Sequence, residues 1–251
     1  EAKMARRRLA FDEVFLLMLR ARHQKLLWEE NARAPVFSSP QKDISTITSR
    51  LPFTLTDDQN TVIRDVARDL TRPVPMNRLL MGDVGSGKTI VAAIAMYSAF
   101  RSGLQSLLMA PTQILAQQHF QTISGILHPL GVRVGLVTGS SKDIDSQCHC
   151  LVGTHALLSK SMTYTNVGLI VIDEQHRFGV VQRQLLGQKG EGSATAHLLT
   201  MTATPIPISV ARTVFGNVDL SVITQMPKGR QKIKTWLVPK EKREKAYEWM
   251  K

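Results

Sequence analysis

The sequence has few cysteines, few aromatic residues and no long hydrophobic run, and these shortages exclude several classes of protein. Two cysteines in 251 residues exclude a disulfide-stapled secreted domain. Cys148 and Cys150 lie too close together to bridge easily or to form a structural zinc site, so we expect buried or half-exposed strand cysteines. No apolar run, 14–19 among them, approaches the roughly 20 residues of a membrane span. With no signal peptide either, we expect a piece of a longer cytoplasmic protein that does not enter a membrane.

The formal net charge is +12, from 32 basic and 20 acidic residues. The segment 225–251 carries nine basic and three acidic side chains, hence +6, whereas 1–34 and the long middle of the chain carry +3 each. A basic flank is either solvated surface or a site of attraction for a polyanion such as nucleic acid. Charge alone leaves both readings open.

The pattern of residues divides the chain into four segments. Residues 1–34 suit a helical arm, 35–52 a linker with Pro and Ser, 53–224 a folded domain, and 225–251 a basic segment that leads onward. Strands are expected at 78–81, 106–110, 133–137, 149–152, 169–172 and 197–200, and helices at 89–101, 113–126, 180–187 and 208–214. This alternation predicts an α/β fold with a mainly parallel sheet covered by helices on both faces. Ligands of such sheets bind at the carboxyl ends of the strands.

One loop follows the first expected strand and matches the phosphate-binding pattern G-x-x-x-x-G-K-[ST]. Its glycines let the backbone turn tightly, so that successive N–H groups point at phosphate oxygens from the start of a helix. In this pattern the lysine reaches the β- and γ-phosphates and the threonine hydroxyl ligates Mg²⁺. The predicted cofactors are therefore ATP and Mg²⁺, bound by Gly82, Asp83, Val84, Gly85, Ser86, Gly87, Lys88 and Thr89.

A second element of the predicted site is the apolar run 169–172, which ends in Asp173 and Glu174. Two carboxylates at the exit of a buried strand are costly unless a cation matches them. We expect Asp173 to hold Mg²⁺ through its water shell, and Glu174 to orient or deprotonate the attacking water.

Further short motifs occur in the order found in superfamily 2 helicases, over about residues 53–207. The stretch from Asp173 to His176 resembles their DExH box, Thr202-Ala203-Thr204 resembles their third motif, and 54–59 resembles their Q-motif. The resemblance implies that Gln59 reads the adenine edge, with Phe53 also in the nucleotide site, and that His176 joins Lys88, Asp173 and Glu174 in catalysis. It also implies coupling by Gln175, His176, Thr202 and Thr204, and DNA contacts by Pro111, Thr112, Thr138, Gly139, Gly153 and Thr154.

Two longer stretches, 173–183 and 201–207, look like the bacterial RecG family. Membership implies a RecA-like lobe that works with a second RecA-like lobe and a DNA-wedge domain of the same parent chain, in an ATP-dependent DNA helicase that remodels stalled forks and Holliday junctions. Ile208 departs from the family, which usually has arginine there. Two alternatives stay open: a catalytically silent nucleotide- and DNA-binding fragment, which the absence of the second lobe's arginine finger favours, and an Mfd-like duplex translocase.

Overall fold

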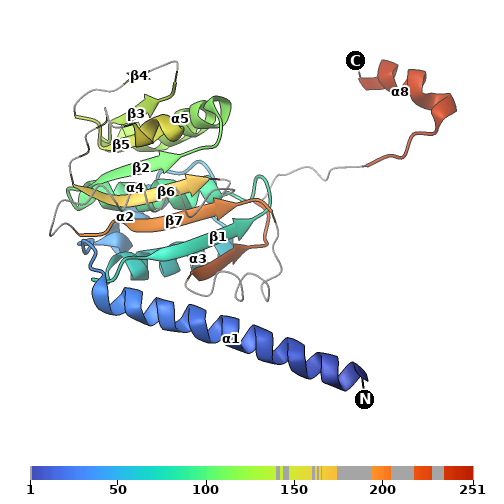
Figure 1. Ribbon diagram of the computed structural model, residues 1–251. Coiled ribbons are helices and arrows are strands. Elements are labelled where there is room, and N and C mark those ends of the chain that lie inside the picture. Colours follow the sequence, from blue (N-terminus) through green and yellow to red (C-terminus); the bar gives the residue numbers. More distant parts are fainter. Residues whose placement is uncertain are drawn as a thin grey trace.

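The computed structural model describes residues 2–139, 142–143, 147–159, 162, 164, 166–173, 194–204, 218–227 and 235–250. At its centre is an eight-stranded sheet with the order β4-β3-β5-β2-β6-β7-β1-β8, in which only the edge pair β3 and β4 is antiparallel (Figure 1). The strands are β1 (Asn77–Gly82), β2 (Gln105–Met109), β3 (Val134–Val137), β4 (Lys142–Asp143), β5 (Cys150–Gly153), β6 (Val167–Asp173), β7 (His197–Thr202) and β8 (Asp219–Ile223). The predicted α/β fold with a mainly parallel sheet is confirmed.

The central strands are buried on both faces, which explains why they are apolar without alternation. Leu108, Val171 and Leu199 pack into the larger core on one side of the sheet. Their neighbours along the strands, among them Ile170 and Leu198, pack into a second core on the other side. A strand between two cores has no solvent-facing position, so a continuous apolar run is what this parallel sheet requires.

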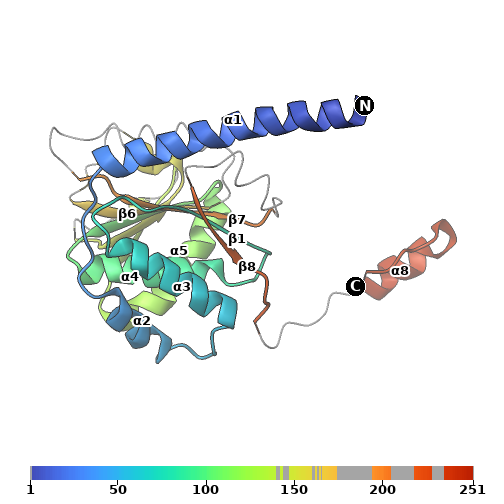
Figure 2. The same cartoon turned by 90° about the horizontal axis from the view of Figure 1, so that it is seen from below.

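Helices α2 to α5 lie together on one face of the sheet, and α1 lies on the opposite side (Figure 2). Helix α4 is the innermost, because every residue from Ile90 to Ala99 is buried. The expected helices at 180–187 and 208–214 lie outside the described residues. The described helices are α1 (Ala2–Asn31), α2 (Pro40–Thr48), α3 (Asp57–Leu70), α4 (Lys88–Arg101), α5 (Gln113–Leu127) and α8 (Arg243–Met250), with short 3-10 turns η1 (His128–Leu130), η2 (His155–Leu158) and η3 (Lys240–Lys242).

The structure differs from the linker expected over 35–52. Residues 40–48 form α2, which begins with proline at its first turn, a position where a missing N–H is harmless. Phe37 and Ile47 are each 1% exposed and belong to the larger core. The stretch is therefore part of the folded lobe, because two large buried side chains hold it against α3 and α4.

The predicted N-terminal helical arm is present as α1. None of its residues is buried, and it meets the sheet domain near its C-terminal end, where Lys25 Nζ lies 2.6 Å from Asp219 Oδ1. After the helix, Thr195 donates its N–H to the Arg33 carbonyl, and Ala34 donates to the Pro73 carbonyl. No described helix is both long enough and apolar enough to cross a membrane.

The edge strand β8 and the helix α3 were not among the expected elements. Helix α3 begins with a capping box, in which Thr56 Oγ1 accepts from the Gln59 N–H and Gln59 Oε1 accepts from the Thr56 N–H. A buried pair then joins α3 to the sheet: Arg78 on β1 donates twice to Asp69 on α3, at 2.9 and 2.7 Å. Arg78 also donates to Ser221 on β8, so one guanidinium connects three elements.

The cysteines lie as expected. Cys150 is in β5, Cys148 precedes it, and both are buried and free. Burial raises the pKa of the Cys150 thiol to about 12, and the Ser106 hydroxyl donates to its sulfur. A thiol held protonated in this way is an inert core residue.

Candidate functional site

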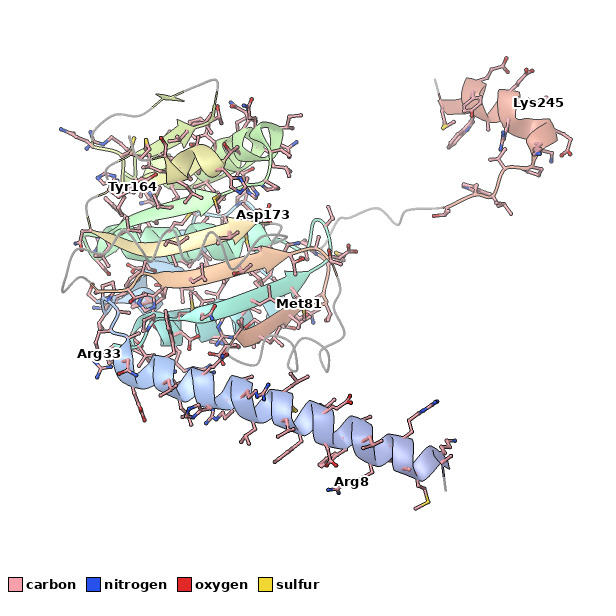
Figure 3. The ribbon with its side chains drawn as sticks, in the orientation of Figure 1. Arg8, Arg33, Met81, Tyr164, Asp173 and Lys245 are labelled. Carbon is pink, nitrogen blue, oxygen red and sulfur yellow. The ribbon has the colours of Figure 1, made fainter. Side chains whose placement is uncertain are left out.

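The carboxyl ends of three neighbouring parallel strands, β6, β7 and β1, bring the predicted motifs to one edge of the sheet. Asp173, the last residue of β6, lies opposite Met201 of β7. Thr202, the last residue of β7, lies opposite Met81 of β1. Figure 3 shows Asp173 and Met81 at the same edge of the sheet. Because β1 runs directly into the loop of residues 82–89, the loop and the Asp173 carboxylate belong to one site.

The loop owes its shape to glycines. Gly85 and Gly87 have φ of 79° and 87°, a left-handed backbone that other residues adopt only with strain. At Gly82 a Cβ would lie 2.6 Å from Ser86 Oγ and 3.2 Å from the Ile223 carbonyl oxygen. Gly87 is the N-cap of α4, so the backbone N–H groups of the loop lie at the N-terminal, positive end of that helix. This is an anion-binding cradle.

Two side chains of the predicted phosphate-binding loop, Lys88 and Thr89, begin helix α4. Lys88 Nζ donates to the carbonyls of Gly82 and Asp83, at 2.7 and 3.1 Å, so the ammonium lies within the curve of the loop. Thr89 follows it in the first turn of α4 and is half-buried. Ser86 is fully buried, and its hydroxyl has no hydrogen-bond partner among the described residues.

Gln59 was expected to read the adenine edge, and the structure gives its amide protein partners. The side chain is 2% exposed. Its Oε1 accepts from Thr56 N–H, and its Nε2 donates to the Ser86 carbonyl at 2.8 Å. Gln59 therefore connects the start of α3 to the phosphate loop, and its contact with adenine stays a prediction.

Phe53 was also expected in the nucleotide site. It is 50% exposed and borders an open cavity of about 640 Å³ between α2 and the start of α3, whose lining includes Ile44, Leu55 and Asn60. An exposed ring beside a hollow suits stacking on a flat ligand. Contact of Phe53 with a nucleotide stays a prediction.

Asp173 has a partner that the sequence did not indicate. His119 on α5 lies with Nε2 at 2.7 Å from Asp173 Oδ2, and each side chain is 11% exposed. His119 falls between the recognised motifs, and the two residues are 54 positions apart. Only the packing of α5 against the sheet brings them together.

Several predicted catalytic and coupling residues lie outside the described part of the chain: Glu174, Gln175 and His176. Of the third motif, Thr202 is buried and Thr204 is exposed. The Thr204 N–H donates to Thr202 Oγ1 at 3.1 Å. This bond forms a tight turn at the end of β7, the strand that pairs with β6. The coupling itself stays a prediction.

The predicted DNA contacts come from three loops that follow β2, β3 and β5. Pro111, Thr112 and Gly139 are exposed and Thr154 is half-buried, whereas Thr138 and Gly153 are buried. A Cβ on Gly153 would lie 2.2 Å from the Val137 carbonyl oxygen, so close strand packing already requires glycine there. Thr112 and Thr154 cap α5 and η2 with their hydroxyls. The exposed members remain candidates for phosphate contacts.

The residues of this edge fit a nucleotide with Mg²⁺. The loop supplies backbone N–H groups and an ammonium for phosphates, and Thr89 and Asp173 supply the hydroxyl and carboxylate oxygens that Mg²⁺ prefers. Among the described residues, no group of three or more His, Cys, Asp or Glu could hold a metal.

The family model of the DEAD/DEAH box helicases matches residues 56–213. The chain therefore belongs to the DEAD/DEAH box helicase family.

Within this family, the chain is similar to bacterial proteins named ATP-dependent DNA helicase RecG. It is 42% identical over 253 residues to that of Aquifex aeolicus, covering 96% of this chain and 31% of the relative. It is 45% identical over 243 residues to that of Staphylococcus aureus strain Mu50, covering 92% and 35%. The resemblance to RecG is confirmed, and the chain spans about a third of the length of these relatives.

Solved structures agree. A structure of RecG bound to a three-way DNA junction superposes with a TM-score of 0.82 at 32% identity, covering 99% of this chain and 34% of that one. A helicase named MrfA, solved with DNA, superposes with a TM-score of 0.58 at 17% identity, covering 77% of this chain and 31% of that one. The second match supports the fold alone.

Proposed function

We propose that this chain is the ATP-binding motor lobe of an ATP-dependent helicase that remodels branched DNA. The observation that carries the proposal is the phosphate cradle at residues 82–89, which lies at the same sheet edge as the Asp173 carboxylate. A cradle beside a carboxylate gives one place for phosphates and for the cation that accompanies them.

In this proposal the lobe binds and orients the nucleotide. Lys88 pairs with the terminal phosphates, Thr89 and Asp173 hold Mg²⁺, and Glu174 activates the attacking water with the help of His176. Bound Mg²⁺ would supply neutralisation of the charge on the phosphate oxygens. Gln175, His176, Thr202 and Thr204 would transmit the state of the phosphate site to DNA. A second RecA-like lobe would supply the arginine that completes hydrolysis, and a wedge domain would split the junction.

DNA is proposed to contact the exposed loops through its phosphates. The junction-bound RecG structure supports DNA as the partner. The exposed positions Pro111, Thr112 and Gly139 suit contacts with the DNA backbone, which position a strand without reading bases. Each phosphate that a lysine or arginine neutralises contributes about −0.9 to the slope of log affinity against log salt, and the chain carries a net charge of +12. The affinity for a three-way junction should therefore fall steeply as the salt concentration rises, and it should not depend on the base sequence of the junction. A flat salt response would contradict the proposal.

The nucleotide site is tested by calorimetry of ATP–Mg²⁺ binding. Lys88→Ala removes the charge-assisted contact and should weaken binding by about 2–4 kcal/mol. Lys42→Ala, on the exposed surface of α2, removes a lysine away from the site and should leave the affinity unchanged. Equal affinities of wild type and Lys88→Ala would overturn the assignment.

A further inference from the structure

The Asp173 carboxylate is already held by a second side chain. His119 Nε2 donates to Oδ2 at 2.7 Å, across a distance of 54 residues in sequence. Both side chains are 11% exposed, so bulk water competes little for the bond. A hydrogen bond to an ionised acceptor in such surroundings is strong and directional. Within the described part of the chain, the other oxygen, Oδ1, has no hydrogen-bond partner and is available to a cation.

The position of His119 is itself fixed by the packing of α5. Ala116 and Ile123, three residues before it and four after it, are both fully buried. Residues at these spacings share one face of a helix. His119 therefore projects from the buried face of α5, which packs on β3 and β5. This packing restricts the movement of the imidazole relative to Asp173.

We propose that His119 is a positioning residue, which orients the Asp173 carboxylate so that Oδ1 faces the Mg²⁺ of the bound nucleotide. The inference rests on the proposed function, in which Asp173 holds Mg²⁺. Carboxylates that ligate metals are commonly oriented by a second hydrogen-bonded group, and loss of that group typically weakens metal affinity about 10–100-fold. His119 is the described side chain placed to do this for Asp173.

A purely structural role makes a different prediction. If the bond only stabilises two buried polar groups, its loss lowers the melting temperature and affects nucleotide binding equally with and without Mg²⁺. If the bond orients Asp173, its loss changes the Mg²⁺ dependence of binding and leaves binding without Mg²⁺ unchanged. The two roles are therefore separated by a binding measurement that needs no turnover.

The test uses a matched pair of polar substitutions. Glutamine places its side-chain nitrogen at the reach of Nε2, whereas asparagine reaches only as far as Nδ1. We expect His119→Asn to raise the Mg²⁺ concentration needed for half-maximal binding of a fluorescent ADP analogue by about tenfold, with no change in EDTA. His119→Gln should stay near wild type. His128→Asn, at the exposed C-terminal end of the same helix, is the control for the substitution itself.

Asp173→Asn separates the failure of this inference from the failure of the proposed function. If Asp173→Asn changes the Mg²⁺ response and His119→Asn does not, the positioning role is wrong and the site stands. If neither variant changes the response, the assignment of Asp173 to Mg²⁺ is wrong, and the inference falls with it. An equal loss of affinity in EDTA and in Mg²⁺ for His119→Asn shows a structural role and also overturns the proposal.

Discussion

Gly87 offers the sharpest test of how the phosphate loop is built. It has a φ of +87°, and a Cβ added there would lie 2.2 Å from Gln59 Nε2. An alanine in left-handed backbone costs roughly 1–2 kcal/mol. Gln59 must also move, and because its buried amide is bonded to Thr56 N–H and to the Ser86 carbonyl, the lost bonds cost about 1–3 kcal/mol more. Gly87→Ala should therefore destabilise the fold by about 2–5 kcal/mol.

Gly131 is the matched control, since its φ is +80° but nothing lies within 4 Å of an added Cβ. Urea unfolding followed by circular dichroism should show a loss of only about 1–2 kcal/mol for Gly131→Ala. In a Gln59→Ala background, Gly87→Ala should cost no more than that. Equal losses for Gly87→Ala and Gly131→Ala in the wild-type background would refute the role given to Gln59.

Three further predictions concern burial, pH and catalysis. Asp69→Ala leaves the buried Arg78 guanidinium without its close carboxylate partner and should destabilise the fold by about 3–5 kcal/mol in urea unfolding. Asp65, the other carboxylate near Arg78, is more exposed. A loss for Asp69→Ala no larger than that for Asp65→Ala would contradict the importance of the buried pair. Burial lowers the pKa of His197 below 6.5, so on acidification the unfolded chain binds a proton at this residue before the folded chain does. The free energy of unfolding should therefore fall as the pH drops below 6.5. His197→Gln should make this fall less steep by up to about 1.4 kcal/mol per pH unit. In a protein that also carries the second motor lobe, Glu174→Gln should lower ATP turnover by at least roughly 10²-fold while nucleotide affinity stays the same; wild-type turnover would exclude Glu174 as the base.

The pH prediction has a structural reason. His197 Nδ1 accepts from the Met76 N–H, and Nε2 bonds to the Pro35 carbonyl. A proton on Nδ1 would face that N–H, so the folded state favours the neutral ring. Glutamine offers a donor and an acceptor without titrating. An unchanged pH profile in His197→Gln would show that another group controls the acid limb.

Local chemistry made the central strands and the phosphate loop predictable from sequence. Parallel strands buried on both faces have continuous apolar sequences. The ends of the six predicted strands therefore fall within two residues of the ends of β1, β2, β3, β5, β6 and β7. The loop was predictable because left-handed backbone demands glycine at Gly85 and Gly87. The edge strand β8 escaped prediction, since its burial depends on its pairing with β1 rather than on its own pattern.

Tertiary structure alone decided which distant groups meet. The segment 35–52 has the composition of a linker, yet Phe37 and Ile47 bury it in the core. Gln59 carries the pattern of a nucleotide-reading residue, but its amide is held by the neighbouring backbone. His119 stands in no motif, because a hydrogen bond between a helix and a strand leaves no periodic trace in the chain. The sequence thus determined the residue types of the proposed site, and the packing of α5 on the sheet decided that His119 meets Asp173.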